Sequence, residues 1–187
     1  QRLLPHVRAL QELANRHGIR DVFQDNGGKL LQLCLTLGIK VLPGREGNDA
    51  VDETTGGEFE LKTLNMDTPG GWTTHHHLNK VILAKYRAVD WIFAAYVGIE
   101  LRAIWRLGPH QMEPQFATWE AKLDRGADHL NNPKVPRSFV LAHEPIWTAD
   151  GGLEFTPPKP IRGRSAPPAM ADSLRHAGSS PARSTEV

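Results

Sequence analysis

Asp49, Glu60 and Lys62 have the side-chain types and the spacing that metal-assisted chemistry uses. A hairpin would bring them together, because turn residues at 54–57 separate a short apolar run after Asp49 from a predicted strand over Glu58–Leu64. Side chains alternate between the two faces of a strand, so Glu60 and Lys62 should share one face and lie beside Asp49.

Two carboxylates that converge at one edge of a sheet repel each other unless a cation lies between them. Mg²⁺ prefers such oxygen ligands and keeps several of its waters. A neighbouring lysine can then orient a water molecule near the metal. The bare Asp…Glu-x-Lys pattern also arises on any exposed, ion-paired strand, which is its commoner origin. The sequence around the motif has to decide between these two interpretations.

Long strings of residues around the motif follow one another in a fixed order: FQDNGGKLLQ at 23–32, LPGREGNDAVD at 42–52, THHH at 74–77, AKYR at 84–87, WIFA at 91–94 and NNPK at 131–134. From Pro5 to about Ala142 the chain resembles the PvuII family of type II restriction endonucleases, within the PD-(D/E)xK nuclease superfamily. The resemblance implies an α/β fold with a mixed central β-sheet flanked by helices. It also implies sequence-specific, Mg²⁺-dependent hydrolysis of double-stranded DNA.

The resemblance further implies a catalytic role for several residues. Asp49 and Glu60 would hold the metal, with Glu46 assisting at a second position and Mn²⁺ able to replace Mg²⁺. Tyr86 would lie near the scissile phosphate. A charged Lys62 would orient the attacking water and stabilise developing negative charge, whereas a neutral Lys62 would take its proton. We favour the charged form.

DNA contacts are implied for a second set of residues: Asp25 in the minor groove, Thr73, His76, His77, Asn131 and Asn132 on bases, and Lys134 near backbone phosphate. Imidazole, hydroxyl and amide groups suit the donors and acceptors of base edges in the major groove. From the residues alone, Asp25 or Asn26 would equally serve as a helix cap, and the two asparagines at 131–132 as turn residues.

The histidines at 75–77 have two further explanations. A zinc or nickel site is one, although consecutive residues of an extended chain diverge, so at most two of the three would share a metal. A solvated polar tract is the other. Two rival functions therefore stand beside the nuclease: a histidine-centred metal hydrolase, and a DNA-binding protein of the same fold that does not cut. The intact Asp49, Glu60 and Lys62 argue against the second rival.

Composition bounds the remaining alternatives. The 187 residues suit one globular domain over 1–155, followed by a tail over 156–187 that is rich in Pro, Ala, Ser, Gly and Arg and is predicted to be disordered. A formal net charge of +1 does not by itself suggest nucleic acid, but local placement of basic residues matters more than the total. With neither a span-length apolar run nor a leader sequence, we expect a cytoplasmic protein that does not enter a membrane.

The elements expected to position these residues alternate between helical and strand patterns. Helices are predicted at Pro5–His17, in the leucine-rich run that ends at Gly38, at Asn79–Val89 and at Pro114–Lys122, and further strands at Ile39–Leu42, Trp91–Tyr96, Leu101–Leu107 and Ser138–Ala142. Loops are predicted at Asn65–Gly71 and Asp124–Pro136. The continuous apolarity of Trp91–Tyr96 predicts a strand that is buried on both faces.

A break in both strands of a duplex requires two active sites, and the chain holds one Asp…Glu-x-Lys motif. A symmetric homodimer on a palindrome supplies the second site. The resemblance implies the palindrome CAGCTG, cut at its centre. The helix over Pro5–His17 presents Val7, Leu10 and Leu13 on one face, and the pattern fits either a core helix or part of the subunit interface.

Overall fold

The computed structural model describes residues 2–42 and 48–150. Glu46, the predicted second metal ligand, and the predicted disordered tail at 156–187 lie outside the described residues. None of the described helices is long and apolar enough to cross a membrane.

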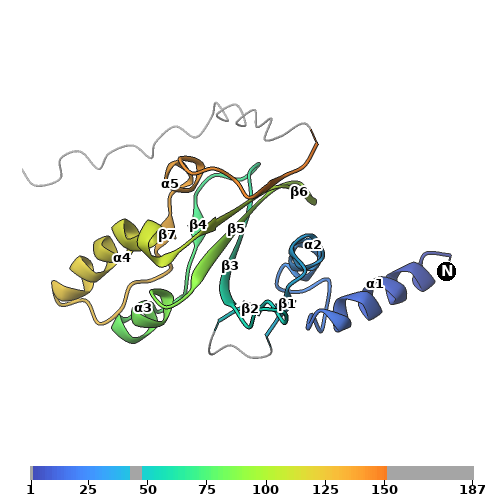
Figure 1. The fold of residues 1–187 in the computed structure, drawn as a ribbon, viewed down its shortest axis with the longest axis horizontal. Coiled ribbons are helices and arrows are strands. Elements are labelled where there is room, and N and C mark those ends of the chain that lie inside the picture. Colours follow the sequence, from blue (N-terminus) through green and yellow to red (C-terminus); the bar gives the residue numbers. More distant parts are fainter. Residues whose placement is uncertain (1, 43–47, 151–187) are drawn as a thin grey trace, which may run out of the picture. The chain divides into compact units, whose positions relative to one another are not determined.

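A mixed six-stranded sheet forms the centre of the described chain (Figure 1), in the order β1-β2-β3-β5-β6-β8. Its strands are β1 (Lys40–Val41), β2 (Ala50–Val51), β3 (Glu58–Asn65), β5 (Asp90–Val97), β6 (Glu100–Leu107) and β8 (Trp147–Thr148). Strands β3 and β5 run parallel, and the other neighbouring pairs are antiparallel. The chain therefore has the α/β architecture with a mixed sheet that the sequence predicted.

The parallel pair β3–β5 requires a crossover connection, because a tight turn can join only antiparallel strands. After β3 the chain forms β4 (Trp72–Thr73) and α3 (Lys80–Tyr86) and then re-enters the sheet as β5. Strand β4 pairs with β7 (Lys134–Val135) in a separate two-stranded sheet. Residues 72–86 are therefore part of the connection between two central strands, a position that matters for the site below.

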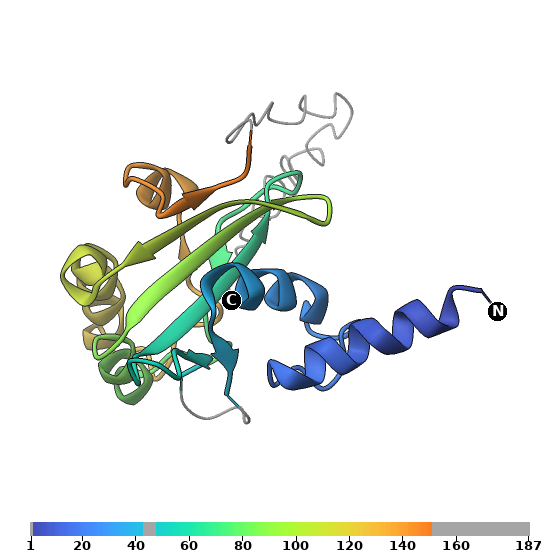
Figure 2. The ribbon, with the colours of Figure 1, turned by 45° about the vertical axis from the view of Figure 1, so that its right-hand side comes forward.

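Strand β5 is buried on both faces, as its continuous apolarity predicted. Trp91 and Phe93 face a core cluster that includes side chains of α3 and α4 (Pro109–Asp124), whereas Ile92 and Ala94 face a cluster that includes Leu33 and Cys34 of α2 (Gly27–Leu37). Figure 2 shows these helices on opposite faces of the sheet. Burial on both sides fixes the position of β5, and with it the position of its parallel neighbour β3.

The first two helices agree well with the sequence predictions. Helix α1 (Leu4–Arg16) has proline in its first turn, and α2 ends where Gly38 adopts a left-handed conformation, with φ at 69°. A third core cluster joins them through Ala14, Ile19, Val22 and Leu31. Helix α1 therefore packs on its own domain through part of its surface, while Leu10 stays 40% exposed.

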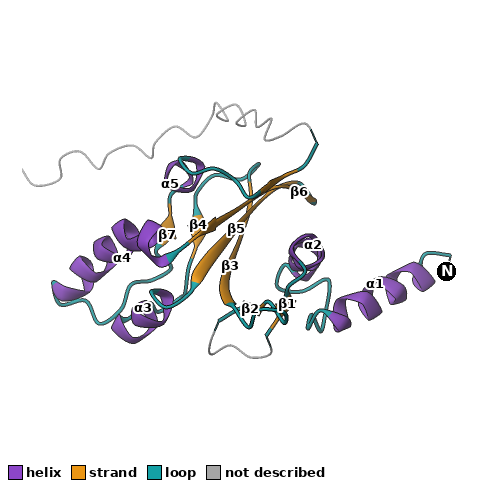
Figure 3. Cartoon of the chain, in the orientation of Figure 1, coloured by secondary structure: helices purple, strands orange, loops and turns teal. Residues whose placement is uncertain are grey.

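Three predictions in the C-terminal half are wrong in type or extent (Figure 3). Residues Ser138–Ala142 were predicted as a strand but lie in helix α5 (Arg137–Leu141) and its C-cap, because a short apolar run fits either element. Helix α4 begins at Pro109, earlier than the predicted Pro114, which lies inside it. The predicted loop Asp124–Pro136 contains β7, a strand too short to show periodicity.

Candidate active site and nucleic-acid interface

The predicted hairpin around Asp49 forms. Ala50 pairs with Phe59, and the backbone amide of Asp49 donates to the carbonyl of Phe59 at 2.9 Å. Asp52 closes the turn with hydrogen bonds to Gly57 and Thr54, each at 2.8 Å, and the tip at 53–56 is exposed.

Asp49, Glu60 and Lys62 converge at this edge of the sheet. The Lys62 ammonium forms an ion pair with Glu60 and lies 3.8 Å from Oδ2 of Asp49. The backbone amide of Leu61 donates to the same Oδ2 at 2.9 Å, which fixes the Asp49 carboxylate against β3. The alternation of side chains along β3 therefore places Glu60 and Lys62 together on one face, as predicted.

The two carboxylates have different environments. The Glu60 side chain is only 5% exposed, whereas that of Asp49 is 44% exposed. Burial raises the pKa of Glu60 above its ordinary value, and the charge of Asp49 raises it further, while Lys62 acts in the opposite direction. The site therefore holds a desolvated carboxylate whose charge a single lysine only partly offsets.

Tyr86 reaches the same group from the end of α3. Its hydroxyl lies within hydrogen-bonding reach of Glu60, and the backbone of His75 hydrogen-bonds to it. Burial and the negative charges of Glu60 and Asp49 raise the pKa of Tyr86, so the phenol stays protonated. The indole of Trp91 anchors this end of the helix, because it donates to the carbonyl of Tyr86 at 3.1 Å.

The oxygen donors at this edge suit a hard divalent cation. Asp49 offers a partly exposed carboxylate beside the buried Glu60, and a cation would offset the charge that Lys62 leaves uncompensated. Over residues 2–42 and 48–150, no three His, Cys, Asp or Glu side chains group together as metal ligands. Asp49 and Glu60 are the two carboxylates at this edge that would hold such a cation.

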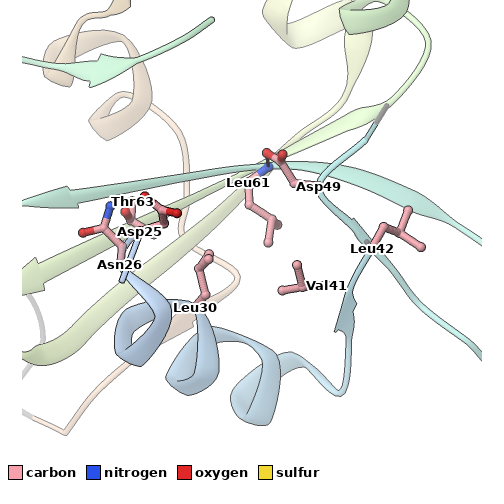
Figure 4. A pocket seen from close by; sticks show the side chains of 8 residues that line it. All are labelled: Asp25, Asn26, Leu30, Val41, Leu42, Asp49, Leu61 and Thr63. Atoms are coloured by element: carbon pink, nitrogen blue, oxygen red, sulfur yellow. Dashed lines mark hydrogen bonds between the residues drawn. The ribbon is translucent and has the colours of Figure 1, made fainter. Parts of the chain in front are cut away.

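Asp25, a predicted DNA contact, lies near Asp49. With Asn26, Asp49 and Thr63 it lines a pocket of about 240 Å³ (Figure 4), in which Asp25, Asn26 and Thr63 gather at one end. Asp25 and Asn26 both have positive φ angles, at 45° and 63°, and the side chain of Asn26 makes no capping hydrogen bond to α2. The capping interpretation therefore fails for Asn26.

The other predicted DNA contacts come together on two paired segments, which we call the reader segments: Thr73–His77 and Asn131–Lys134. Thr73 pairs with Lys134 across β4 and β7, and Thr74 donates to the carbonyl of Pro133 through its amide at 3.1 Å and its hydroxyl at 2.7 Å. Gly71 permits this approach, since a Cβ there would lie 2.3 Å from the carbonyl oxygen of Val135.

Side chains from the two reader segments meet at their exposed surface. Nδ2 of Asn132 lies 3.1 Å from Nδ1 of His76, and the rings of His76 and His77 have centroids 4.2 Å apart. The ring of His77 also contacts His129, which the sequence did not single out, at a centroid distance of 4.5 Å. In the described part of the chain these histidines form no cluster of three metal ligands.

The family model for restriction endonuclease PvuII matches residues 1–147. The chain belongs to this family. The match spans both the β2–β3 hairpin and the reader segments, and it extends a few residues beyond each end of the stretch from Pro5 to Ala142. The PvuII family comprises nucleases that act on double-stranded DNA, and restriction endonucleases of this kind generally use divalent metal ions. The predicted restriction-endonuclease-like fold is thereby confirmed.

The raised pKa of Glu60 leads to a prediction about stability. A group whose pKa is raised by folding stabilises the fold below its unfolded pKa, and that contribution is lost as pH rises through the folded pKa. With chelator present, the unfolding midpoint of Glu60→Gln minus that of the unsubstituted protein should therefore increase as pH rises from about 4 to 8. Calorimetry or circular dichroism at several pH values measures this difference.

Glu58→Gln, an exposed change on the same strand, is the matched control and should show no such trend. Addition of Mg²⁺ should raise the unfolding midpoint of the unsubstituted protein more than that of Glu60→Gln, because a bound ligand stabilises the folded state. If the unfolding midpoints of Glu60→Gln and the unsubstituted protein differ by the same amount at every pH, the electrostatic interpretation is contradicted.

Proposed function

We propose that the protein is a type II restriction endonuclease that uses Mg²⁺ to cut double-stranded DNA at the centre of CAGCTG. The observation that carries this proposal is the convergence of Asp49, Glu60 and Lys62, with the Lys62 ammonium paired to one carboxylate and 3.8 Å from the other. The reader segments support it, since they gather imidazole, amide and hydroxyl groups on one surface.

In this proposal Asp49 and Glu60 hold the metal, with Glu46 at a second position. Mg²⁺, or Mn²⁺ in its place, supplies a Lewis acid that offsets charge on the scissile phosphate. Lys62, in its charged form, orients the attacking water and stabilises negative charge that develops on the phosphoryl oxygens. Tyr86 stays protonated, and its hydroxyl donates a hydrogen bond to hold the Glu60 carboxylate in place.

Sequence recognition is assigned to the reader segments and to Asp25. His76, His77, Asn131, Asn132 and Thr73 contact bases in the major groove, and Lys134 neutralises backbone phosphate. Asp25 reaches the minor groove. We also propose that residues 1–155 belong to the nuclease domain, that the tail at 156–187 has no part in cleavage, and that the enzyme acts in the cytoplasm.

Loss of the catalytic groups should separate cutting from binding. Asp49→Ala and Lys62→Ala should each lower kcat/KM for cleavage by about a thousandfold or more, because both act on charge that develops in the transition state. Binding to the target duplex should remain measurable, since the reader segments are unchanged. Plasmid digestion with Mg²⁺ and with chelator, together with a gel-shift assay, measures both properties.

Lys40→Ala is the matched control, because Lys40 is a half-exposed lysine on the neighbouring strand β1, and its ammonium pairs with Glu53 at 3.0 Å. It should cut at the unsubstituted rate. Near-normal cleavage by Asp49→Ala or Lys62→Ala would remove this site from consideration. DNA binding without cleavage by the unsubstituted protein would instead favour the non-cutting DNA-binding alternative.

The proposed target is tested by sequencing the ends of digested genomic DNA. Fragments should begin and end at the centre of CAGCTG with blunt ends, because the proposed cut lies on the two-fold axis of the palindrome. Fragments that end in another motif would show that the reader residues have been assigned to the wrong bases.

A homodimer is proposed as the working unit, and an exposed apolar surface supports it. Leu10 of α1, Phe23, Leu35 of α2 and Ile99 in the β5–β6 turn are 40%, 72%, 49% and 75% exposed. They line a groove of about 470 Å³ between these elements. Monomeric proteins rarely leave so many large apolar side chains together in water. A second copy of the chain is the partner that two cuts in a palindrome require.

The dimer is tested by light scattering on DNA-free protein over a concentration series. The unsubstituted protein should have twice the mass of one chain, and Leu35→Glu should dissociate it, because a buried unpaired carboxylate is costly. Ile146→Glu, an exposed apolar position outside the groove, is the control and should stay dimeric. A monomer at every concentration that only nicks plasmid DNA would contradict the dimer.

A further inference from the structure

His129 contacts a reader segment without belonging to either one. It lies in the connection between α4 and β7, and its ring meets that of His77 edge to face, with centroids 4.5 Å apart and ring planes at 78°. His77 in turn contacts His76, and His76 lies beside Asn132. Four polar side chains from two distant parts of the sequence thus form one continuous row: His129, His77, His76 and Asn132.

The backbone holds this contact in place. Leu78 and Leu130 exchange two hydrogen bonds, at 2.9 Å and 2.7 Å, and the side chain of Leu78 is fully buried. His77 and His129 each directly precede one of these leucines, so the bridge between the leucines brings the two histidines close together. Both histidines are exposed. The bridge between the buried Leu78 and the half-buried Leu130 therefore fixes the two imidazoles side by side on the outer surface.

Building on the proposed function, we infer that His129 is a positioning residue for sequence recognition, which holds the His77 ring in the orientation that reads a base. An exposed imidazole rotates freely about its outer side-chain bond, and a misoriented ring presents its donor and acceptor to the wrong base edge. An edge-to-face contact with a second ring restricts that rotation.

The electrostatics of the row agree with this role. Desolvation and the imidazoles of His76, His129 and His75 hold the pKa of His77 below its ordinary value. A lowered pKa keeps the ring neutral, and a neutral imidazole offers one donor and one acceptor, whereas the protonated ring offers donors alone. Removal of His129 takes away one of the groups that lower the pKa of His77, so the His77 ring should become protonated at a higher pH. As the solution is acidified, the substituted enzyme should therefore lose discrimination between sequences at a higher pH than the unsubstituted enzyme.

The test compares two substitutions at this position. Cleavage is measured as kcat/KM on a duplex that carries the target found by end sequencing, and on duplexes with one symmetric base-pair change at each half-site position. His129→Ala should lower the ratio of target to altered site by about tenfold at one half-site position, the scale of one base contact. His129→Phe keeps a ring against His77 and should retain most of that ratio.

His110→Ala, an exposed histidine on α4, is the control and should leave every ratio unchanged. An unchanged ratio in His129→Ala, in an enzyme that does discriminate, would overturn this inference alone. Equal loss in His129→Ala and His129→Phe would also overturn it, because His129 would then contact DNA through its own nitrogens. Failure of the unsubstituted protein to cut or to discriminate would overturn the proposed function first.

Discussion

The ion pair between Glu60 and Lys62 lies on the face of β3 that adjoins the aromatic core, and the arrangement of the site depends on it. A carboxylate that is 5% exposed would be costly without a partner. Lys62 supplies the partner, and its ammonium also lies 5.7 Å from the centre of the Trp91 ring. Because β5 is fixed by burial on both faces, the parallel register of Glu60 with Trp91 fixes the pair as well.

Tyr86 depends on a second charged group, at the surface. Arg87 forms hydrogen bonds to Glu113 and Glu120 of α4, at distances from 2.8 to 3.1 Å, and lies over the ring of Phe116. Two charge-assisted, forked contacts from one guanidinium hold the end of α3 against α4. Tyr86 directly precedes Arg87, so this clamp limits the movement of the phenol relative to Glu60.

The sequence predicted the β2–β3 hairpin because its signals are local. Alternation along β3 was enough to place Glu60 and Lys62 on one face, and turn residues were enough to return Asp49 to them. The approach of Tyr86 to Glu60 and of His129 to His77 depends on contacts between distant segments, which no local pattern encodes. The roles of Tyr86 and the reader residues came from the family resemblance, and no signal marked His129. The short helix α5 was mistaken for a strand because burial of Phe139 and Val140 suits either element.

The first reader segment leads directly into the helix that carries Tyr86. Asn79 begins that helix, and its side chain accepts a hydrogen bond from the amide of Ile82 at 3.0 Å, with Leu78 alone between it and His77. Lengthening this connection would shift the start of α3 and move Tyr86 away from Glu60. The β2–β3 turn, by contrast, has an exposed tip, where an added residue would leave the paired strands in place. Under the proposed roles, a new target would therefore arise by exchange of side chains along the reader segments, whereas an insertion between His77 and Asn79 would displace Tyr86 from Glu60.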